Sequence, residues 1–310
     1  MHKVLVCDSI DPASVEEMRA AGLAVDVKTG LSPKELCEVA APYHALVVRS
    51  ATKVTKDVLE RASNLKLVVR GGVGVDNIAV EDAKRRGVEV MNTPEAASVS
   101  VAEHAIALMF ALARRVAAAD ASIRAGKWEK ARFEGTELWR KTLGLVGLGR
   151  IATEVARRAV GIGMKVIACC RSGRIPDELA SLGVAIVPLD ELLGRADIVS
   201  LHLPFSKDSH HLFDEARFAR MKKGAVLVNC ARGGIVDEAA LAKAIESGHL
   251  GGAAVDVYEK EPVEATNPLL ALPNVILTPH LGASTAEGQS RVGAAIAKKV
   301  IAFFASAQAR

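Results

Sequence analysis

Short apolar runs alternate with helical patterns along the first part of the chain. Runs rich in Val, Ile and Leu that alternate with helices are typical of parallel strands buried on both faces of a sheet. A first helix begins at Pro12, with Ser14 as a possible cap. The pattern therefore predicts an α/β unit with a parallel sheet. Its strands are expected at residues 4–8, 25–29, 45–49, 65–70 and 88–92.

A second series of apolar runs begins near Thr142 and predicts a second doubly wound parallel sheet. Between the two series, residues 98–115 form a helical pattern rich in Ala and Leu, which we interpret as a buried helix between domains or between two copies of the chain. The last amphipathic pattern, residues 284–304, is expected to return as a helix that packs on the first unit. The strands of the second sheet are expected at residues 143–146, 164–170, 185–189, 197–204, 225–231, 251–258 and 274–280.

The composition is that of an ordinary soluble globular protein. Half of the 310 residues are apolar and a quarter are charged. The net charge of +4 suits a small anionic ligand, and Lys and Arg form no basic arm, so no nucleic-acid partner is expected. The most apolar helical stretch, residues 106–112, is too short to span a bilayer, so no membrane partner is expected.

The cysteines and the N-terminus bear on location and on metals. The first residues contain no long apolar stretch and no small-residue cleavage site, so they predict a first strand and not a signal peptide. The five cysteines are odd in number and form no C-x-x-C motif. We therefore expect a reducing cytoplasm, no disulfide framework and no metal site.

A glycine-rich loop follows the first strand of the second series. Gly147 and Gly149 come directly after residues 143–146, a helix starts at once, and Ala152 occupies the third small position. In a βαβ unit the first glycine permits a tight turn, the second lets a pyrophosphate approach the backbone, and the small third residue lets helix and strand pack closely. The helix N-terminus then supplies N–H groups to the phosphates. The loop therefore predicts a dinucleotide site.

The next strand ends without the acidic residue that usually binds the adenosine ribose of NAD. Cys170 stands there, and Arg171, Ser172 and Arg174 follow. A carboxylate at this position repels a 2′-phosphate, whereas a nearby arginine accommodates one. The stretch predicts that NADP is favoured over NAD, and the alternative is a solvated basic turn beside bound NAD.

Polar residues follow three of the later strands. Arg232 comes after residues 225–231, Glu261 after 251–258 and His280 after 274–279. A histidine can exchange a proton with a hydroxyl near neutral pH, and a carboxylate bonded to its other nitrogen fixes its tautomer. An arginine can bind a carboxylate through two N–H groups. The three residues together predict hydride transfer between a nicotinamide and a hydroxy acid.

A second glycine cluster, residues 71–74, follows the strand at 65–70 but opens no helix in the right register. It is either a tight loop with positive φ or a set of backbone amides for a substrate carboxylate. Arg49 and Arg70 each end an apolar strand and predict a further anionic or strongly polar group on the substrate; the alternative is that they are surface charges.

With these residues in hand, the chain resembles the D-isomer-specific 2-hydroxyacid dehydrogenases, and among them most closely the D-3-phosphoglycerate dehydrogenases. The resemblance covers nearly the whole chain. It is carried by VRSATKV (48–54), GGVGVDN (71–77), VMNTPEAASVSVAEHAIALM (90–109), GTELWRKTLGLVGLGRIA (135–152), VNCARGGIVDEAAL (228–241), GGAAVDVYEKEP (251–262) and TPHLGAST (278–285).

The resemblance implies a Rossmann-type cofactor domain, residues 98–283, inserted into a flavodoxin-like substrate domain made of residues 1–97 and 284–310, and a homodimer formed through 98–140. It implies that Arg232 binds the substrate carboxylate, that His280 is the acid–base residue with Glu261 as its partner, and that Arg49 and Arg70, beside Gly71 and Gly72, meet a substrate phosphate. It also implies that further residues line the cofactor, namely Val73, Arg150, Ile151, Leu203, Pro204, Cys230, Ala231, Asp256, Gly282 and Ala283.

Two alternatives to a phosphoglycerate enzyme stay open, and a third is disfavoured. One alternative is a hydroxypyruvate or glyoxylate reductase. Another is a corepressor with the same fold and the same triad, which would sense the cofactor and bind partner peptides. Formate dehydrogenases use a glutamine beside the catalytic histidine, and the Glu261–His280 pair argues against them. The chain ends at Arg310 without the C-terminal regulatory module of longer phosphoglycerate dehydrogenases, so serine feedback through such a module is not expected.

Overall fold

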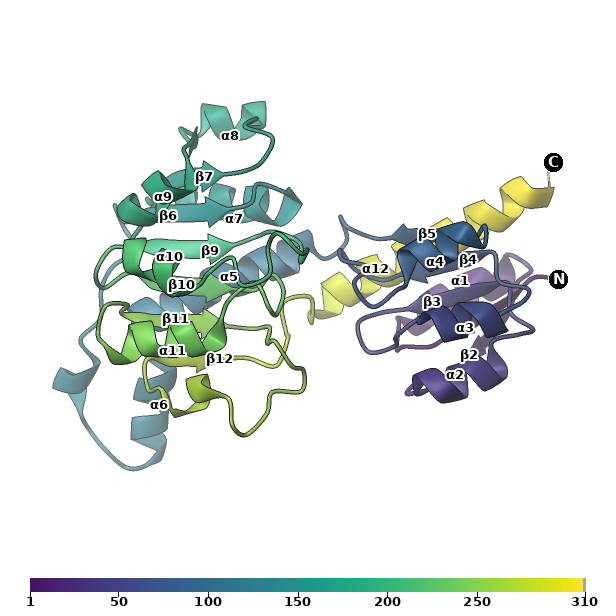
Figure 1. The fold of residues 1–310 in the computed structure, drawn as a ribbon, viewed down its shortest axis with the longest axis horizontal. Helices are drawn as coiled ribbons and strands as arrows, with labels where there is room; N and C mark the ends of the chain where they lie inside the picture. The colour runs from purple at the N-terminus through teal and green to yellow at the C-terminus, as the bar shows by residue number, and fades with distance from the viewer. Residues whose placement is uncertain (309–310) are drawn as a thin grey trace. The chain divides into compact units, whose positions relative to one another are not determined.

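A computed structural model describes residues 1–308 and divides the chain into two compact units. One unit consists of Met1–Ser98 together with the segment that starts at Ala283, and the other is Val99–Gly282. Each unit is built around one parallel sheet with helices on both faces, which confirms the predicted α/β class (Figure 1).

The first unit holds a five-stranded parallel sheet in the order β2-β1-β3-β4-β5. Its side chains alternate between two cores, because successive residues of a strand point to opposite faces. Val4, Val47 and Val69 pack on the side of α1 and α12, whereas Leu46 and Val68 pack on the side of α2, α3 and α4. The strands are β1 (Lys3–Val6), β2 (Ala24–Val27), β3 (Ala45–Val48), β4 (Leu67–Arg70) and β5 (Glu89–Asn92), and the helices are α1 (Pro12–Ala20), α2 (Pro33–Val39), α3 (Lys56–Arg61), α4 (Val80–Arg85) and α12 (Ala286–Gln308).

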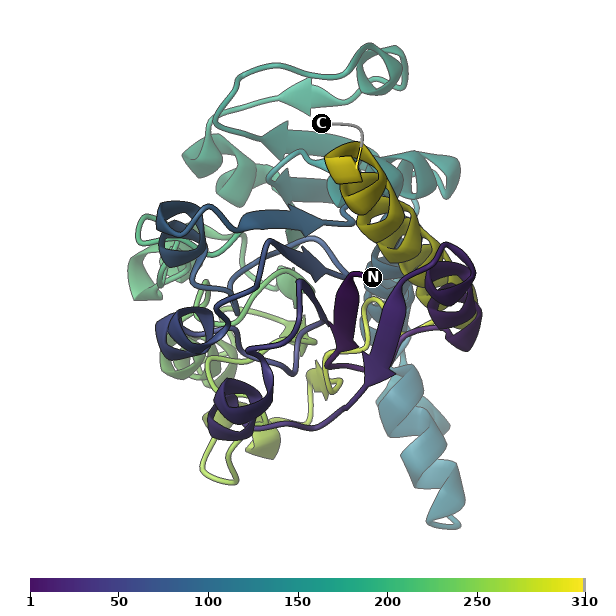
Figure 2. The ribbon, with the colours of Figure 1, turned by 90° about the vertical axis from the view of Figure 1, so that its right-hand side faces the viewer.

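Helix α12 belongs to this unit, as the amphipathic pattern predicts, and packs beside α1 (Figure 2). The predicted cap of α1 is wrong. Asp11 caps the helix by accepting a hydrogen bond from the Ala13 N–H, since Pro12 occupies the first helical position. Ser14 is buried and faces α12, where a Cβ on Gly293 would lie 2.3 Å from its hydroxyl oxygen.

The second unit holds a seven-stranded parallel sheet in the order β12-β11-β10-β9-β6-β7-β8. Its strands are β6 (Thr142–Val146), β7 (Lys165–Cys169), β8 (Ala185–Ile186), β9 (Ile198–Leu201), β10 (Val226–Asn229), β11 (Gly252–Val255) and β12 (Val275–Leu277). Its α-helices are α5 (Ser98–Ala113), α6 (Val116–Arg124), α7 (Arg150–Gly161), α8 (Asp177–Ser181), α9 (Leu189–Arg195), α10 (Glu215–Arg220) and α11 (Glu238–Glu246), and its short 3₁₀ helices are η1 (Lys130–Phe133) and η2 (Pro268–Ala271).

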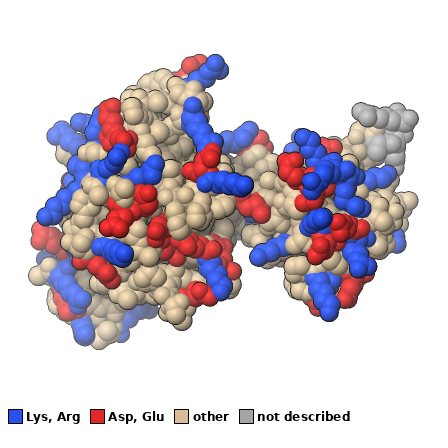
Figure 3. Space-filling model, in the orientation of Figure 1, with Lys and Arg blue, Asp and Glu red and all other residues tan. Residues whose placement is uncertain are grey.

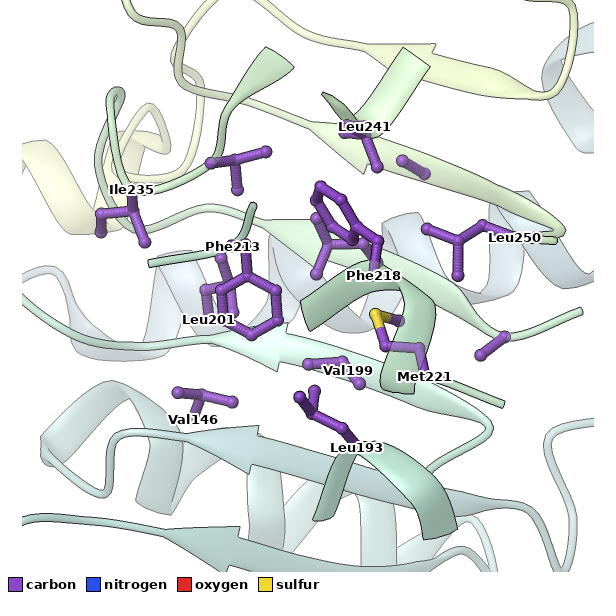
Figure 4. Close-up of a cluster of buried hydrophobic side chains, with 14 of the residues drawn as sticks. Val146, Leu193, Val199, Leu201, Phe213, Phe218, Met221, Ile235, Leu241 and Leu250 are labelled. Atoms are coloured by element: carbon purple, nitrogen blue, oxygen red, sulfur yellow. The ribbon is translucent and has the colours of Figure 1, made fainter. Parts of the chain in front are cut away.

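A large apolar core lies between this sheet and helices α9, α10 and α11. Phe213 and Phe218 are almost fully buried there, against Leu201 and Met221 (Figure 4). The core holds the central strands in place, so that the loops at their carboxyl ends start from a rigid edge. Charged side chains of both signs are interspersed on the face of the unit that Figure 3 shows.

Two predicted elements of this unit are shorter than their apolar runs. The helix expected at 98–115 ends at Ala113, because Arg115 adopts a left-handed conformation with φ 53° and a new helix, α6, begins at Val116. The strand expected at 185–189 is reduced to Ala185–Ile186 at the sheet edge. Of the helices in the described part of the chain, none combines the length and the apolarity needed to cross a membrane.

Candidate active site

The carboxyl edge of the seven-stranded sheet carries most of the predicted site residues. In an open parallel sheet, ligands bind outside the carboxyl ends of the strands, where the strand order reverses. Strand β6 lies at that point, between β9 and β7. Along this edge the chain places His280 after β12, Asp256 and Glu261 after β11, Arg232 after β10, Leu203 and Pro204 after β9, Gly147 and Gly149 after β6, and Cys170 after β7.

The glycine loop after β6 has no room for side chains at its first position. Gly147 has a φ of 96°, and a Cβ there would lie 2.2 Å from the carbonyl oxygen of His202. Gly149 is the N-cap residue of α7 and offers no side chain to cap its first N–H groups. Ala152, near the start of α7, is fully buried. The first turn of α7, with Arg150 and Ile151, therefore presents backbone N–H groups that can donate hydrogen bonds to an anion.

His280 and Glu261 form the hydrogen-bonded pair that acid–base chemistry requires. The Nδ1 atom of His280 lies 2.8 Å from a carboxylate oxygen of Glu261, and the other oxygen of Glu261 accepts a hydrogen bond from the Tyr258 N–H. Burial raises the pKa of Glu261, but the hydrogen bond and the charge interaction with His280 outweigh it and hold that pKa below its ordinary value. A carboxylate on Nδ1 favours the tautomer in which Nε2 can accept a proton. About a third of the His280 side chain is exposed, so a ligand can reach it.

Arg232 lies on the loop after β10, beside the strand that leads to Glu261. One of its guanidinium N–H groups donates to the Ala231 carbonyl at 2.7 Å, and the Asn229 side chain donates to the Arg232 carbonyl. Gly233 is required here because a Cβ would lie only 1.7 Å from the Tyr258 carbonyl oxygen. The Arg232 loop is thus packed directly on the backbone that precedes Glu261.

Asp256 is the most buried ionised group of the site, with 1 % of its surface exposed. Burial raises the pKa of Asp256, but hydrogen bonds from His104, Thr278 and the Leu281 N–H outweigh it and bring that pKa below its ordinary value. His104 comes from α5 and is not among the site residues that the sequence predicts. One feature of the sequence could have suggested a role for His104: it places an imidazole in a helix that is otherwise rich in Ala and Leu.

Three potential metal-ligand atoms, from His104, Cys230 and Asp256, lie within 4.8 Å of one another. Both carboxylate oxygens of Asp256 already accept hydrogen bonds from backbone N–H groups. Burial raises the pKa of the Cys230 thiol well above its ordinary value. A metal ligand must instead be deprotonated. His104 and Asp256 of this cluster are hydrogen-bonded together with Thr278.

The loop after β7 is folded on itself by local bonds. The Ser172 hydroxyl lies 3.4 Å from the Cys170 sulfur and accepts a hydrogen bond from the Arg174 N–H. Arg171 forms an exposed ion pair with Asp208, 3.0 Å away, a contact that no sequence pattern predicts. The remaining predicted cofactor positions of this unit differ in access: Cys230, Ala231 and Gly282 are buried, Ile151 and Leu203 are half-buried, and Pro204 is exposed.

In the first unit, the two predicted substrate arginines sit at neighbouring strand ends. Arg49 follows β3, and Arg70 is the last residue of β4. The Arg49 guanidinium donates to the Gln289 side chain on α12, and the Arg70 guanidinium lies over Gly72, where a Cβ would be 2.2 Å from it. Gly71 packs on α12, and Ala283 and the half-exposed Val73 lie in the same unit. Burial lowers the pKa of Arg49 below its ordinary value, which marks a guanidinium partly withdrawn from water.

Comparison with known proteins decides the family. A family model described as "D-isomer specific 2-hydroxyacid dehydrogenase, NAD binding domain" matches residues 106–282. A D-3-phosphoglycerate dehydrogenase of Archaeoglobus fulgidus is 48% identical over 300 residues, which are 96% of this chain. The chain belongs to the D-isomer-specific 2-hydroxyacid dehydrogenases. It spans about half the length of this curated relative (56%).

Two solved structures share this fold across nearly the whole chain. A glyoxylate reductase from Paecilomyes thermophila is 31% identical and superposes with a TM-score of 0.88 over 96% of this chain and 94% of its own. A D-lactate dehydrogenase from Aquifex aeolicus, solved with NAD and lactic acid, is 30% identical, with a TM-score of 0.86 over 98% and 96% of the two chains. These relatives differ in substrate, so membership of the family leaves the substrate to the residues of this chain.

Proposed function

We propose that this chain transfers a hydride between a nicotinamide cofactor and a D-2-hydroxy acid or its 2-oxo acid. The observation that carries the proposal is the 2.8 Å bond between His280 and Glu261 at the carboxyl edge of the sheet, with Arg232 on the adjacent strand end. The glycine loop after β6 lies on the same edge, and its uncapped helix start fits the pyrophosphate of a dinucleotide. In this proposal the second unit binds the cofactor and holds the reacting groups, and the first unit contributes residues that bind the substrate.

The chain's own residues divide the chemistry as follows. Arg232 binds the substrate carboxylate through its guanidinium fork and orients the carbinol carbon. Nε2 of His280 accepts the hydroxyl proton during oxidation and returns it during reduction, while Glu261 stabilises the imidazolium that forms. The nicotinamide, when bound, accepts or donates the hydride. Leu203, Pro204, Cys230 and Ala231 are proposed to line the cofactor.

The proposed substrate pair is 3-phosphoglycerate and 3-phosphohydroxypyruvate. Arg49 and Arg70 end neighbouring strands, which suits a second anionic group on the substrate, and the curated relative described above is a D-3-phosphoglycerate dehydrogenase. Reduction of hydroxypyruvate or glyoxylate is the second candidate, and it is favoured by the likeness to the glyoxylate reductase structure.

A screen of 2-oxo acids with NADH and NADPH tests both candidates. The screen compares kcat/KM for 3-phosphohydroxypyruvate, hydroxypyruvate, glyoxylate and pyruvate, and we expect the phosphorylated acid to be preferred. Equal values for pyruvate and the phosphorylated acid would contradict a role for Arg49 and Arg70 in phosphate binding. Cofactor binding without turnover of any acid would favour a cofactor-sensing binding protein instead.

We also propose a preference for NADP(H) over NAD(H). Cys170 leaves the end of β7 without a carboxylate to repel a 2′-phosphate, and Arg171, Ser172 and Arg174 follow it. Asp208 pairs with Arg171 and competes with a phosphate for the same guanidinium. The ratio of kcat/KM for the two cofactors tests the preference: Arg171→Ala should abolish it, and Cys170→Asp should improve activity with NAD(H). A wild-type enzyme that favours NAD(H) contradicts the proposal.

The assembly is proposed to be a homodimer formed through α5, α6 and residues 125–139. Helix α6 projects from the body of its unit (Figures 1 and 2), and large apolar side chains stay exposed along this region. They are Phe110, Val116, Ile123, Trp128 and Trp139, of which Trp128 is 85% exposed. A hollow of about 520 Å³ beside them is lined by the end of α5, residues 132–138 and the starts of β9 to β12. A second copy would cover this apolar surface.

Light scattering at micromolar concentration tests the dimer, and a monomer there would contradict it. A cytoplasmic location also stays a proposal, supported by cysteines that are all free thiols in the described residues. Cell fractionation tests it.

A further inference from the structure

The segment that carries His280 is anchored to Asp256. The Thr278 hydroxyl and the Leu281 N–H donate to one carboxylate oxygen of Asp256, at 2.6 and 2.8 Å. The Gly282 N–H donates to the other oxygen at 2.9 Å, and the His280 N–H donates to the Asp256 backbone carbonyl at 2.9 Å. Four of the five residues from 278 to 282 are thus hydrogen-bonded to one aspartate at the end of β11.

This anchoring holds His280 in a backbone conformation that is uncommon for residues other than glycine. His280 has a φ of 54°, in the left-handed region that non-glycine residues adopt only where their surroundings hold them. The Nδ1 atom reaches Glu261 from that backbone conformation. A shift of the Asp256 carboxylate would therefore move the imidazole relative to Glu261.

His104 supports the anchor from a third element. Its Nε2 atom, on α5, lies 3.3 Å from the Asp256 carboxylate oxygen and 3.2 Å from the Thr278 hydroxyl oxygen. Its side chain is four-fifths buried, and Asp256 is almost fully buried. A carboxylate in such a place stays ionised only while donors surround it. His104 brings to it an N–H donor from a helix that carries no other residue of the proposed site.

We infer that His104 is a positioning residue for the His280–Glu261 pair and acts on it through Asp256. The inference rests on the proposed function, because it concerns the proton transfer assigned to His280. It also gives Asp256 a role besides the cofactor contact expected from the family resemblance: its bonds hold the His280 segment.

Two substitutions at His104 separate hydrogen bonding from packing. In His104→Gln the amide nitrogen takes the place of Nε2 and can still donate to Asp256. In His104→Asn the same amide is one carbon shorter, occupies the place of Nδ1 and falls short of the carboxylate. We expect kcat to fall about tenfold or more for His104→Asn, since a misplacement of ~1 Å costs up to ~10²-fold in rate. We expect kcat of His104→Gln to stay close to the wild-type value.

The pH dependence gives a readout that a purely structural role would not move. During oxidation of the hydroxy acid, activity rises with pH as His280 becomes able to accept a proton. If His280 is displaced from Glu261, its imidazolium loses support, and the acid limb of the kcat/KM profile moves to lower pH. The limb should move in His104→Asn and stay at the wild-type position in His104→Gln. Equal kcat values and pH profiles in both variants and the wild type would overturn the inference.

Hydrogen exchange tests the anchor without any activity and so separates this inference from the proposed function. The amides of residues 280–282 should exchange faster in His104→Asn than in the wild type, and at the wild-type rate in His104→Gln. Should His104→Asn fail to fold, Thr278→Val keeps the side-chain shape, removes a second donor to Asp256 and should speed exchange at the same amides. Unchanged exchange in the folded variants would overturn the inference, even for an enzyme active on hydroxy acids. One zinc ion bound per wild-type chain, and lost in His104→Gln, would also overturn it, because His104 would then be a metal ligand.

Discussion

Replacing Gly233 with alanine should disable the proposed active site by a single methyl group. Gly233 follows Arg232, and the added Cβ would lie 1.7 Å from the Tyr258 carbonyl oxygen and 2.4 Å from the carbonyl carbon. Both are backbone atoms, so no side chain can rotate away to make room. The Tyr258 N–H in turn donates a hydrogen bond to Glu261, so the added methyl group would displace both the Arg232 loop and the backbone that holds Glu261.

The expected size of the effect follows from that geometry. Contacts of a real Cβ essentially never fall below 3.0 Å, so the two backbone segments must separate by about 1.3 Å. A displacement of ~1 Å at reacting groups can cost ~10²-fold in rate. Overpacking of this kind also destabilises a fold by about 1–3 kcal/mol. We therefore expect kcat/KM to fall about 100-fold while the protein remains folded.

The assay compares kcat/KM, cofactor affinity and thermal unfolding of Gly233→Ala with those of Gly194→Ala. Gly194 lies inside α9, and an added Cβ there meets no atom within 4 Å. Alanine should stabilise that helix by up to ~1 kcal/mol and leave kcat/KM unchanged. Cofactor affinity should fall less than kcat/KM in Gly233→Ala, because the glycine loop starts from β6, and only Cys230 and Ala231 of the proposed cofactor residues lie on the displaced loop after β10. A Gly233→Ala enzyme with near-normal kcat/KM and an unchanged Tm would refute the packing of the Arg232 loop on Tyr258.

The remaining substitutions probe the acid–base pair, the cofactor loop and the phosphate site. His280→Ala should lose ~10²- to 10⁴-fold in kcat with cofactor still bound, and near-normal turnover would contradict its role. Glu261→Gln should move the acid limb of the kcat/KM profile to lower pH, because the imidazolium loses its carboxylate, and an unmoved limb would mean that the pair does not act in catalysis. Asp208→Asn should tighten NADP(H) binding up to about fivefold, as expected for release of a surface ion pair, and unchanged affinity would place the 2′-phosphate away from this loop. Gln289→Leu should raise KM for the phosphorylated acid and not for glyoxylate, because Gln289 holds the guanidinium of Arg49, and equal effects on both acids would contradict it.

Patterns along the chain are enough to predict the class of fold and the local chemistry of the site. Apolar runs report burial directly, because a strand covered on both faces has no polar position to offer water. The glycine loop could be recognised because its requirements are local: Gly147 needs a positive φ, and α7 starts at Arg150, directly after Gly149. The local predictions failed where a neighbour along the chain was misjudged, as at Ser14, which packs on α12 while Asp11 caps the helix.

Which of these residues come into contact depends on how the elements pack in three dimensions. Strands β10, β11 and β12 lie side by side because the chain builds outward from β9, and this order is not encoded in any of the three strands alone. It brings His280 to Glu261 across adjacent strand ends. The contacts of Asp208 with Arg171 and of His104 with Asp256 join positions far apart in sequence. Hydrogen bonds and ion pairs act over a few ångströms of space, so periodicity along a chain predicts an element and the residue at its end, whereas the partner of that residue depends on how the elements pack.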